Sequence, residues 1–173
     1  MSTETKTPDI KEQFIDLYHN NLTAIKADLP EFFNNHREKA MDHFRKLGIP
    51  SKKVEKYKYT DLSGVFNKEY RHYLKPKTID FNLEDIFRCD VPELDTQVIL
   101  LLNGWYASPD SKLMELPGGA VIGSIREAAK KYPELVKAHY NQYAHSEEES
   151  LTALNTAFAQ DGVFFYVPKN KTV

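Results

Sequence analysis

Basic and aromatic side chains that could bind a charged partner are concentrated in residues 45–77. This stretch holds ten lysines and arginines against three acidic residues, with tyrosine and phenylalanine interleaved among them. Basic groups release counterions from phosphate and aromatic rings stack on bases, so the composition suits nucleic acid. It also suits a protein-docking face, or a solvated face with half-buried tyrosines. Because no helix-turn-helix, RNP or zinc-finger signature is present, the stretch favours a solvated face or a protein-docking face, with a nucleic-acid-binding module as the alternative.

The centre of this stretch, "KKVEKYKY", has the highest density of lysine and tyrosine. We predict that the protein-contact surface lies there. Its predicted residues are Lys52, Lys53, Lys56, Tyr57, Lys58 and Tyr59.

Other patterns that could support chemistry are incomplete. In "GGAVIGS" the spacing from Gly118 to Gly123 resembles a phosphate loop, but Ser124 and Ile125 stand where a lysine and a hydroxyl residue are needed. A turn before a capped helix explains the pattern better. No nucleophile elbow organises a catalytic triad. We therefore predict that the chain is not an enzyme and has no catalytic residues.

Metal-ligand spacing is also missing from the sequence. No HxxxH or CxxC pair occurs among the six histidines and one cysteine. His36 and His43 could share a helix face, and His145 precedes three glutamates, but amphipathic packing and a solvated acidic loop explain these positions. We predict no metal ligands and no cofactor ligands in the chain itself.

Composition and charge describe an ordinary globular protein. The formal net charge is -2 and 41% of residues are hydrophobic, so the chain as a whole is not a bulk polyanion binder. Its single cysteine, Cys89, excludes an internal disulfide and suits a reducing cytosol. No apolar run is long enough to cross a bilayer as a helix. These features predict a soluble cytoplasmic protein without a membrane partner.

The first third of the chain is predicted to be helical. Apolar residues recur at helical spacing from Ile10 to Leu29, after a start signal at Thr7-Pro8-Asp9. A second helix is expected from Phe33 to Leu47, ended by Gly48, and the two would form a hairpin. A short helix is expected near residues 60–66.

The middle of the chain changes to mixed α/β patterning. Residues 97–108 predict a hairpin with a buried first strand and a turn at Asn103-Gly104. A short strand and a helix with a Ser124–Glu127 capping box follow. After a polar linker over residues 141–150, a short helix leads through Asp161-Gly162 into the apolar strand "VFFYV".

Three stretches together resemble one family. "GIPSKKVEKYKYTDL" is similar to the G-x-P turn and E-x-W-K-Y-T-x-L segment of the SufD branch of the SufB/SufD iron-sulfur cluster assembly proteins, with Tyr57 in place of the tryptophan. "LLNGWYASPDSKLMELPGGAVIGSIREA" resembles the family's hairpin, P-x-G turn and S-x-x-E-A helix. "LNTAFAQDGVFFYVPKN" resembles the segment that SufD and SufB share before their β-helix.

The resemblance implies an α+β fold that ends at the first strand of a right-handed parallel β-helix. The implied domains are a helical N-terminal region (1–95), a small α/β unit (96–158) and the start of a truncated β-helix domain (159–173). The strand of residues 163–167 would then need cover. We expect it to pair with an edge of the α/β unit, for example beside "VILLL" (residues 98–102), or with a second copy in a homodimer.

The resemblance also implies a function. A SufD-like protein joins SufB and the ATPase SufC in the SufBCD complex, so this region would be a non-catalytic domain for protein contact and scaffold support. An iron-sulfur cluster would be held only by the full complex, because Cys89 alone cannot supply about four thiolates. Cys89 itself is expected to be a buried, small apolar side chain.

Overall fold

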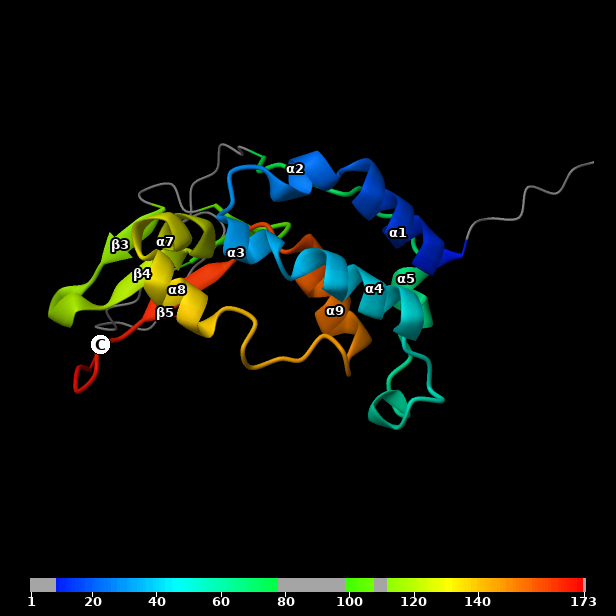
Figure 1. Cartoon of the computed structure of the whole chain (residues 1–173). Helices are drawn as coiled ribbons and strands as arrows, with labels where there is room; N and C mark the ends of the chain where they lie inside the picture. The colour runs from blue at the N-terminus through cyan, green and yellow to red at the C-terminus, as the bar shows by residue number, and fades with distance from the viewer. Residues whose placement is uncertain (1–8, 78–98, 108–111, 173) are drawn as a thin grey trace, which may run out of the picture. The chain divides into compact units, whose positions relative to one another are not determined.

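The computed structural model (Figure 1) describes residues 9–77, 99–107 and 112–172. It confirms an α+β fold, in two compact units. The helical unit combines Met1–Leu74 with Ala129–Gln160, and the sheet unit combines Lys75–Ala128 with Asp161–Val173. Each unit is thus built from two segments that are distant in the sequence. The domain boundaries drawn from the sequence stay predictions, and the one at residue 95 lies outside the described residues.

The first predicted helix forms as two helices, so the prediction of one continuous helix to Leu29 is wrong. Helix α1 (Ile10–Asn20) and helix α2 (Leu22–Lys26) are separated at Asn21. The Asn21 side-chain amide donates to the Leu17 carbonyl at 2.8 Å, which is a local bond that competes with helix continuation. Asp9 caps α1 by accepting from the Lys11 backbone N–H at 3.2 Å, whereas Thr7 and Pro8 lie outside the described residues.

The second predicted helix also has a break near its start. Helix α3 (Glu31–Asn34) precedes helix α4 (Arg37–Leu47). The predicted end is confirmed, because Gly48 follows α4 at a φ of 68° and donates its N–H to the Phe44 carbonyl. A positive φ strains residues that carry a Cβ atom, so glycine suits this position.

The remaining helices of the helical unit lie on both sides of the linker at residues 141–150. The short helix α5 (Ser63–Phe66) is confirmed. Helix α8 (Pro133–His139) was not predicted, although Pro133 occupies its first turn as expected of a helix start. Helix α9 (Ser150–Phe158) is the predicted helix after the linker.

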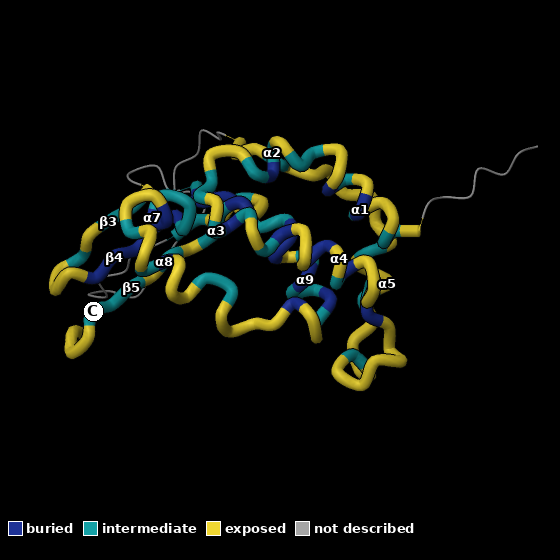
Figure 2. The backbone as a smooth tube through the Cα atoms, viewed as in Figure 1, coloured by how far each residue is buried: buried dark blue, intermediate teal, exposed yellow. Residues whose placement is uncertain are grey.

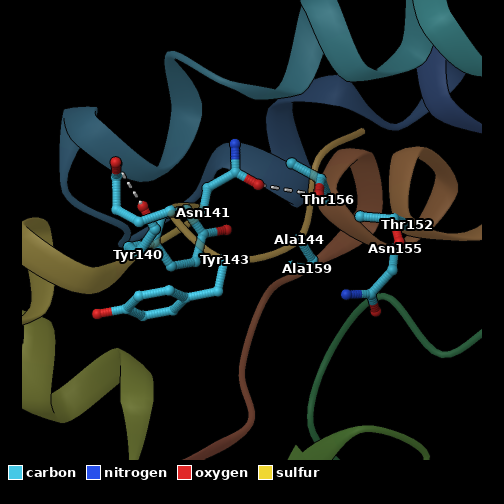
Figure 3. A pocket seen from close by; sticks show the side chains of 9 residues that line it. Tyr140, Asn141, Tyr143, Ala144, Thr152, Asn155, Thr156 and Ala159 are labelled. Carbon is cyan, nitrogen blue, oxygen red and sulfur yellow. Dashed lines mark hydrogen bonds between the residues drawn. The ribbon is translucent and has the colours of Figure 1, made fainter. Parts of the chain in front are cut away.

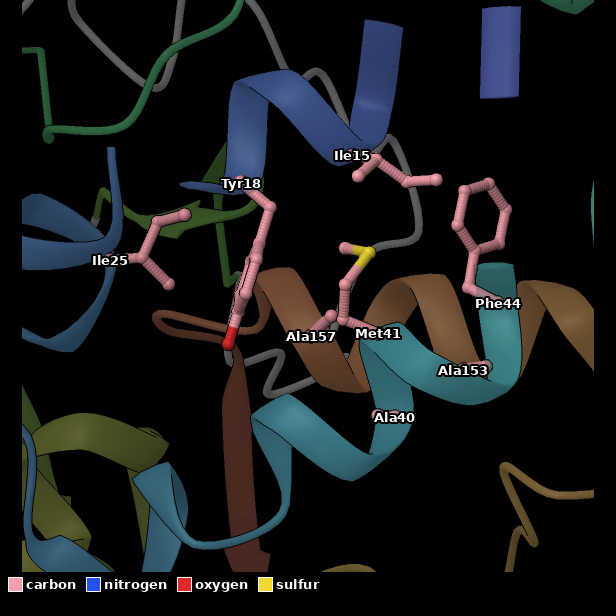
Figure 4. Close-up of a cluster of buried hydrophobic side chains, with 8 residues drawn as sticks. All are labelled: Ile15, Tyr18, Ile25, Ala40, Met41, Phe44, Ala153 and Ala157. Atoms are coloured by element: carbon pink, nitrogen blue, oxygen red, sulfur yellow. The ribbon is translucent and has the colours of Figure 1, made fainter. Parts of the chain in front are cut away.

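The core of the helical unit lies between α1, α2, α4 and α9. Figure 4 shows the buried side chains that fill it, and Figure 2 shows the buried sides of α4 and α9 in contrast to the exposed loop between α4 and α5. Alanines on α4 and α9 allow these two helices to pack closely. The core residues are Ile15, Tyr18, Ile25, Ala40, Met41, Phe44, Ala153 and Ala157.

A buried arginine joins α4 to the end of α9. Arg37 is completely buried, and its guanidinium donates to the Ala157 carbonyl at 2.9 Å and to the Ala159 carbonyl. Its Nε donates to the Asn34 side chain at 2.9 Å. Burial lowers the pKa of Arg37. The carbonyls at the C-terminal end of a helix carry partial negative charge, so they stabilise this cation in place of a carboxylate.

The sheet unit contains an antiparallel sheet with strand order β3-β4-β5. Strands β3 (Leu113–Glu115) and β5 (Val163–Tyr166) flank the fully buried strand β4 (Val121–Ser124). β5 pairs with β4 in the register Ile122↔Phe165, so it pairs with a strand of the 96–158 region as expected, but the pairing beside "VILLL" is wrong. Val163 and Phe165 of β5 are exposed.

The predicted hairpin is confirmed as a separate two-stranded sheet. Strand β1 (Leu101–Leu102) pairs with strand β2 (Trp105–Tyr106) across Asn103 and Gly104, which both have positive φ. The first strand is less buried than predicted, because Leu101 is 44% exposed while Trp105 and Tyr106 are buried. The short strand has only one cross-strand neighbour among the described residues, and this explains the exposure of Leu101.

Gly123 allows β3 and β4 to approach closely. A Cβ atom on Gly123 would lie 2.3 Å from the Lys112 carbonyl oxygen, far inside van der Waals contact. This close approach accounts for the last glycine of "GGAVIGS", which was interpreted from the sequence as part of a turn. The first glycines belong to the 3-10 helix η2 (Pro117–Gly119) before β4.

Helix α7 (Ile125–Lys131) begins where β4 ends, and the predicted cap at Ser124 is confirmed. The Ser124 hydroxyl accepts from the Glu127 N–H at 3.2 Å and donates to Asp161 Oδ1 at 2.6 Å. The Ser124 N–H donates to the Lys112 carbonyl instead of to the Glu127 carboxylate, so only half of the predicted capping box forms.

No helix in the described part of the chain is long and apolar enough to span a membrane. Cys89 lies outside the described residues, and its role stays a prediction.

Candidate protein-contact surface

The residues predicted to contact a protein lie on one loop between α4 and α5. We call residues 51–60 the basic loop. Successive backbone bonds fold it: the Val54 N–H donates to Ser51, Tyr57 to Val54 and Thr60 to Tyr57, at 2.8–2.9 Å. The 3-10 helix η1 (Glu55–Tyr57) lies at its centre. A chain of such short turns orders the loop without burying it.

The basic loop is attached to the beginning of α9 at two points. The Ser150 hydroxyl donates to the Gly48 carbonyl, just before the loop. The Tyr57 hydroxyl donates to Glu149 Oε1. Glu149 is also the N-cap of α9, because its Oε2 accepts from the Thr152 N–H at 2.6 Å. Both attachments lead to the beginning of α9, so the loop is anchored to the helical unit as well as ordered by its own turns.

The hydrogen bond between Tyr57 and Glu149 shifts the pKa of both side chains. The hydrogen bond to the Glu149 carboxylate, with partial burial and the charge of Glu149, raises the pKa of Tyr57 to about 12. Burial works to raise the pKa of Glu149, but hydrogen bonds from Tyr57 and from the Thr152 and Leu151 N–H groups outweigh it, so this pKa is lowered. Each residue therefore favours the protonation state that keeps the bond.

The far end of the loop is closed by Asp61. Its carboxylate accepts from the Ser63 hydroxyl at 2.6 Å and from the Ser63 N–H at 3.0 Å, and it lies 3.0 Å from Lys52 Nζ. The Ser63 hydroxyl, Lys52 and the Ser63 N–H together lower the pKa of Asp61 to about 2. Asp61 therefore stays ionised over the whole physiological range.

All six predicted surface residues come together on the basic loop, and five of them are exposed. Tyr59 is 92% exposed and has the Lys58 ammonium 5.6 Å from its ring centroid. Tyr57 is the exception, since it is half-buried and directs its hydroxyl to Glu149. Lys53 and Lys56 have no ion-pair partner within the described ranges, whereas Lys58 lies 3.7 Å from Glu55.

The rest of the basic stretch is partly absorbed by packing. Phe66 meets Phe14 of α1 edge to face, with ring centroids 5.9 Å apart. His72 meets the same ring at 6.0 Å. Tyr70 and Tyr73 remain exposed. The alternative that tyrosines pack beneath a basic face therefore does not hold for these two exposed rings, whereas Tyr57 is half-buried and contacts Glu149 at the beginning of α9.

Sequence reasoning missed the residues that hold the loop. Glu149 and Ser150 fell within a segment interpreted as a polar linker, and their partners lie about 100 residues earlier. The only local signal is that Glu149 directly precedes the apolar pattern of α9, where an N-cap acceptor is needed.

Apart from the basic loop, a pocket lies between residues 140–144 and α9, within the helical unit. Figure 3 shows this pocket of about 240 Å³, with the Asn141 amide directed toward Thr156, whose hydroxyl lies 3.4 Å from Asn141 Oδ1. Its other polar side chains are amides and hydroxyls. Neutral groups of this kind could bind a polar segment, but they supply no general acid or base that is active near neutral pH.

The histidines considered from the sequence are dispersed. His43 Nδ1 lies 3.4 Å from the Ser146 hydroxyl, and the His36 ring lies 6.1 Å from that of Tyr140. No group of three or more histidine, cysteine or acidic side chains gathers at a metal-binding distance in the parts that the structure describes.

Nearly the whole chain is similar to proteins of one known family. The family model described as the SufBD protein N-terminal region matches residues 8–173. An iron-sulfur cluster assembly SufBD family protein of Arabidopsis thaliana is 29% identical over 167 residues, covering 86% of this chain and 35% of the relative. One of Pyropia yezoensis is 26% identical over 166 residues, covering 86% and 33%.

A bacterial relative gives the same result. The iron-sulfur cluster assembly SufBD family protein of Staphylococcus saprophyticus is 26% identical over 154 residues, covering 82% of this chain and 32% of its own. The chain thus spans about a third of the length of the curated relatives that it matches. No solved structure matches it.

Proposed function

Because the chain belongs to the SufBD family of iron-sulfur cluster assembly proteins, we propose that it serves cluster assembly as a non-catalytic domain. Its work is protein–protein contact and support of the scaffold on which clusters are built. The proposed location is the cytosol, because a chain with a single cysteine suits a reducing compartment.

We assign the chain to the SufD branch, with SufB and SufC as its partners in a SufBCD complex. The motif of the basic loop supports this assignment, since Glu55, Lys58 and Tyr59 match the E-x-W-K-Y segment of that branch. The proposal includes no cofactor held by this chain alone. A common cluster takes about four thiolates, and the whole sequence has one thiol.

The observation that carries the proposal is that the basic loop exposes its side chains while its backbone is held in place. Its lysines and Tyr59 are exposed, while Tyr57 and Gly48 attach it to Glu149 and Ser150. A loop that is ordered before binding loses less conformational entropy when a partner docks. Exposed side chains on a fixed backbone are what a protein-contact surface requires.

Co-purification tests this function directly. The chain, carrying an affinity tag, is co-expressed with the SufB-type and SufC-type proteins of the same organism. We expect at least one of them to be retained with the chain at physiological salt and to elute with it in gel filtration. Retention of neither protein, by a chain that circular dichroism shows to be folded, would contradict the proposal.

A further inference from the structure

The basic loop has a charge pattern that selects among anionic partners. Four lysines and one glutamate lie within residues 51–60. Two of the lysines are already engaged, Lys52 with Asp61 at 3.0 Å and Lys58 with Glu55 at 3.7 Å. Lys53 and Lys56, for which the described part of the chain holds no carboxylate partner, remain available for a charge outside the chain.

Apolar surface accompanies these two charges. Tyr59 is 92% exposed and Val54 is 45% exposed, on the same loop. A tyrosine buries a large area at a low cost in side-chain entropy, which is why tyrosine is enriched at protein interfaces. Such a combination of free cations and an exposed ring fits a surface that is both acidic and locally apolar.

We propose that the basic loop binds an acidic protein surface, with Lys53 and Lys56 pairing with carboxylates and Tyr59 entering an apolar recess between them. This inference rests on the proposed function and adds the chemistry of the partner's surface. Glu149 is a positioning residue, because it holds Tyr57 and thereby fixes the turns that carry Lys53, Lys56 and Tyr59.

The same features disfavour nucleic acid and lipid. A phosphate backbone carries charge continuously along its length and would bring some of it close to Glu55 and Asp61, whereas a protein surface can place its carboxylates opposite Lys53 and Lys56 alone. Of the two tyrosines of the basic loop, only Tyr59 has an exposed ring, because Tyr57 is half-buried against Glu149, whereas single-stranded nucleic acid stacks on several successive rings. A membrane surface would gain little from two apolar side chains.

Fluorescence anisotropy with defined probes tests the chemistry of the surface. The probes are a labelled glutamate-rich peptide with one central leucine and a labelled oligothymidylate with the same number of charges. The variants are Lys53→Glu/Lys56→Glu and Tyr59→Ala. The control is Lys68→Glu/Lys169→Glu, which makes the same change in net charge at two exposed lysines outside the loop.

We expect the peptide to bind the wild-type chain more tightly than the oligonucleotide does. The double charge reversal and Tyr59→Ala should each weaken peptide binding by about tenfold, and the control by about twofold or less. Tighter binding of the oligonucleotide that depends on the same lysines would overturn the inference in favour of nucleic acid. Equal loss in the loop variant and the control would overturn it as well.

Co-purification with the SufB-type and SufC-type proteins separates this inference from the proposed function. If the wild-type chain is retained and the loop variants are retained equally, the inference is wrong and the function stands. If the wild-type chain is not retained but its peptide binding depends on the loop, the proposed function is wrong and the surface chemistry stands.

Discussion

The Tyr57 hydroxyl donates a hydrogen bond to Glu149 Oε1, and the other oxygen of the same carboxylate caps α9. One side chain thus connects the order of the basic loop to the beginning of a core helix. Because Tyr57 and Glu149 are 92 positions apart, this connection exists only in the folded chain. The contact surface therefore depends on the packing of α9 as well as on its own sequence.

Removal of the Tyr57 hydroxyl should loosen the basic loop without disturbing the core. In Tyr57→Phe, we expect the free energy of unfolding to fall by about 1 kcal/mol, the usual contribution of one hydrogen bond. Hydrogen exchange at the Val54 and Thr60 amides should accelerate, because their turns lose an attachment. Tyr70→Phe is the matched control, since Tyr70 is exposed, and unchanged loop exchange in Tyr57→Phe would contradict the role of the bond.

The pH at which Tyr57 loses its proton reports the same contact. Its pKa is about 12 in the folded chain and 10.0 for a free side chain, so between these values the unfolded chain releases a proton that the folded chain retains. The stability that this bond contributes is complete below about pH 10 and is lost as the pH rises through about 12.

Glu149→Gln should lower the pKa of Tyr57 toward 10 by removing the negative acceptor. NMR titration of tyrosines labelled with carbon-13 at the ζ position measures the shift. The Tyr57→Phe variant identifies the resonance of Tyr57. A Tyr57 pKa that is the same in wild type and Glu149→Gln would show that this carboxylate is not the partner in solution.

Loss of the buried guanidinium of Arg37 should destabilise the helical unit much more than loss of an exposed arginine. Arg37→Met preserves length and apolar contact but leaves the Ala157 and Ala159 carbonyls without their donors. We expect a loss of about 2–4 kcal/mol in urea unfolding, since each buried unsatisfied carbonyl costs about 1–3 kcal/mol. Arg45→Met removes an exposed arginine that pairs with Asp42, and this variant should lose less than about 1 kcal/mol of its free energy of unfolding.

Gly123→Ala should destabilise the sheet unit. The added Cβ would lie 2.3 Å from the Lys112 carbonyl oxygen and 2.7 Å from Leu113 Cα, so β3 must move away from β4. We expect a loss of more than about 1 kcal/mol. Gly64→Ala is the control, because no atom lies within 4 Å of its added Cβ, and this variant should be neutral or slightly more stable. Similar stabilities in the two variants would contradict the close approach.

Much of the fold follows from local sequence signals. The hydrophobic periodicity predicted α1, α4 and α9, and Gly48 and Ser124 predicted the end of α4 and the start of α7. These signals act within a few residues, so the sequence displays them directly. Where two local preferences competed, as at Asn21, the side-chain bond to the Leu17 carbonyl interrupted a helix that periodicity alone would continue.

Contacts between distant segments could not be predicted in the same way. The six residues of the predicted surface do gather on one loop, but the bond from Tyr57 to Glu149 depends on how α9 packs. The prediction that β5 lies beside "VILLL" was wrong for a related reason. "VILLL" and "VIGS" are both apolar, so local composition does not decide which of them pairs with β5, and in the structure "VIGS" is the neighbour.

The predicted homodimer through β5 can be tested by oligomeric state. β5 is an edge strand in the described sheet, with Val163 and Phe165 exposed. If two copies pair through these edges, sedimentation should show a dimer whose fraction rises with concentration, and Phe165→Lys should shift it to monomer. Thr172→Lys adds the same charge at an exposed position outside the strand and should leave the dimer intact. A wild-type chain that stays monomeric at high concentration would contradict the homodimer.

The packing of α4 against α9 has a consequence for biosynthesis. A ribosome adds about 5–20 residues per second, so the roughly 100 residues between these helices take about 5–20 s to emerge. During that interval the apolar side of α4 has no α9 to cover it, and Arg37 lacks its two carbonyl acceptors. The nascent N-terminal half is therefore expected to be a chaperone client until translation has passed residue 158.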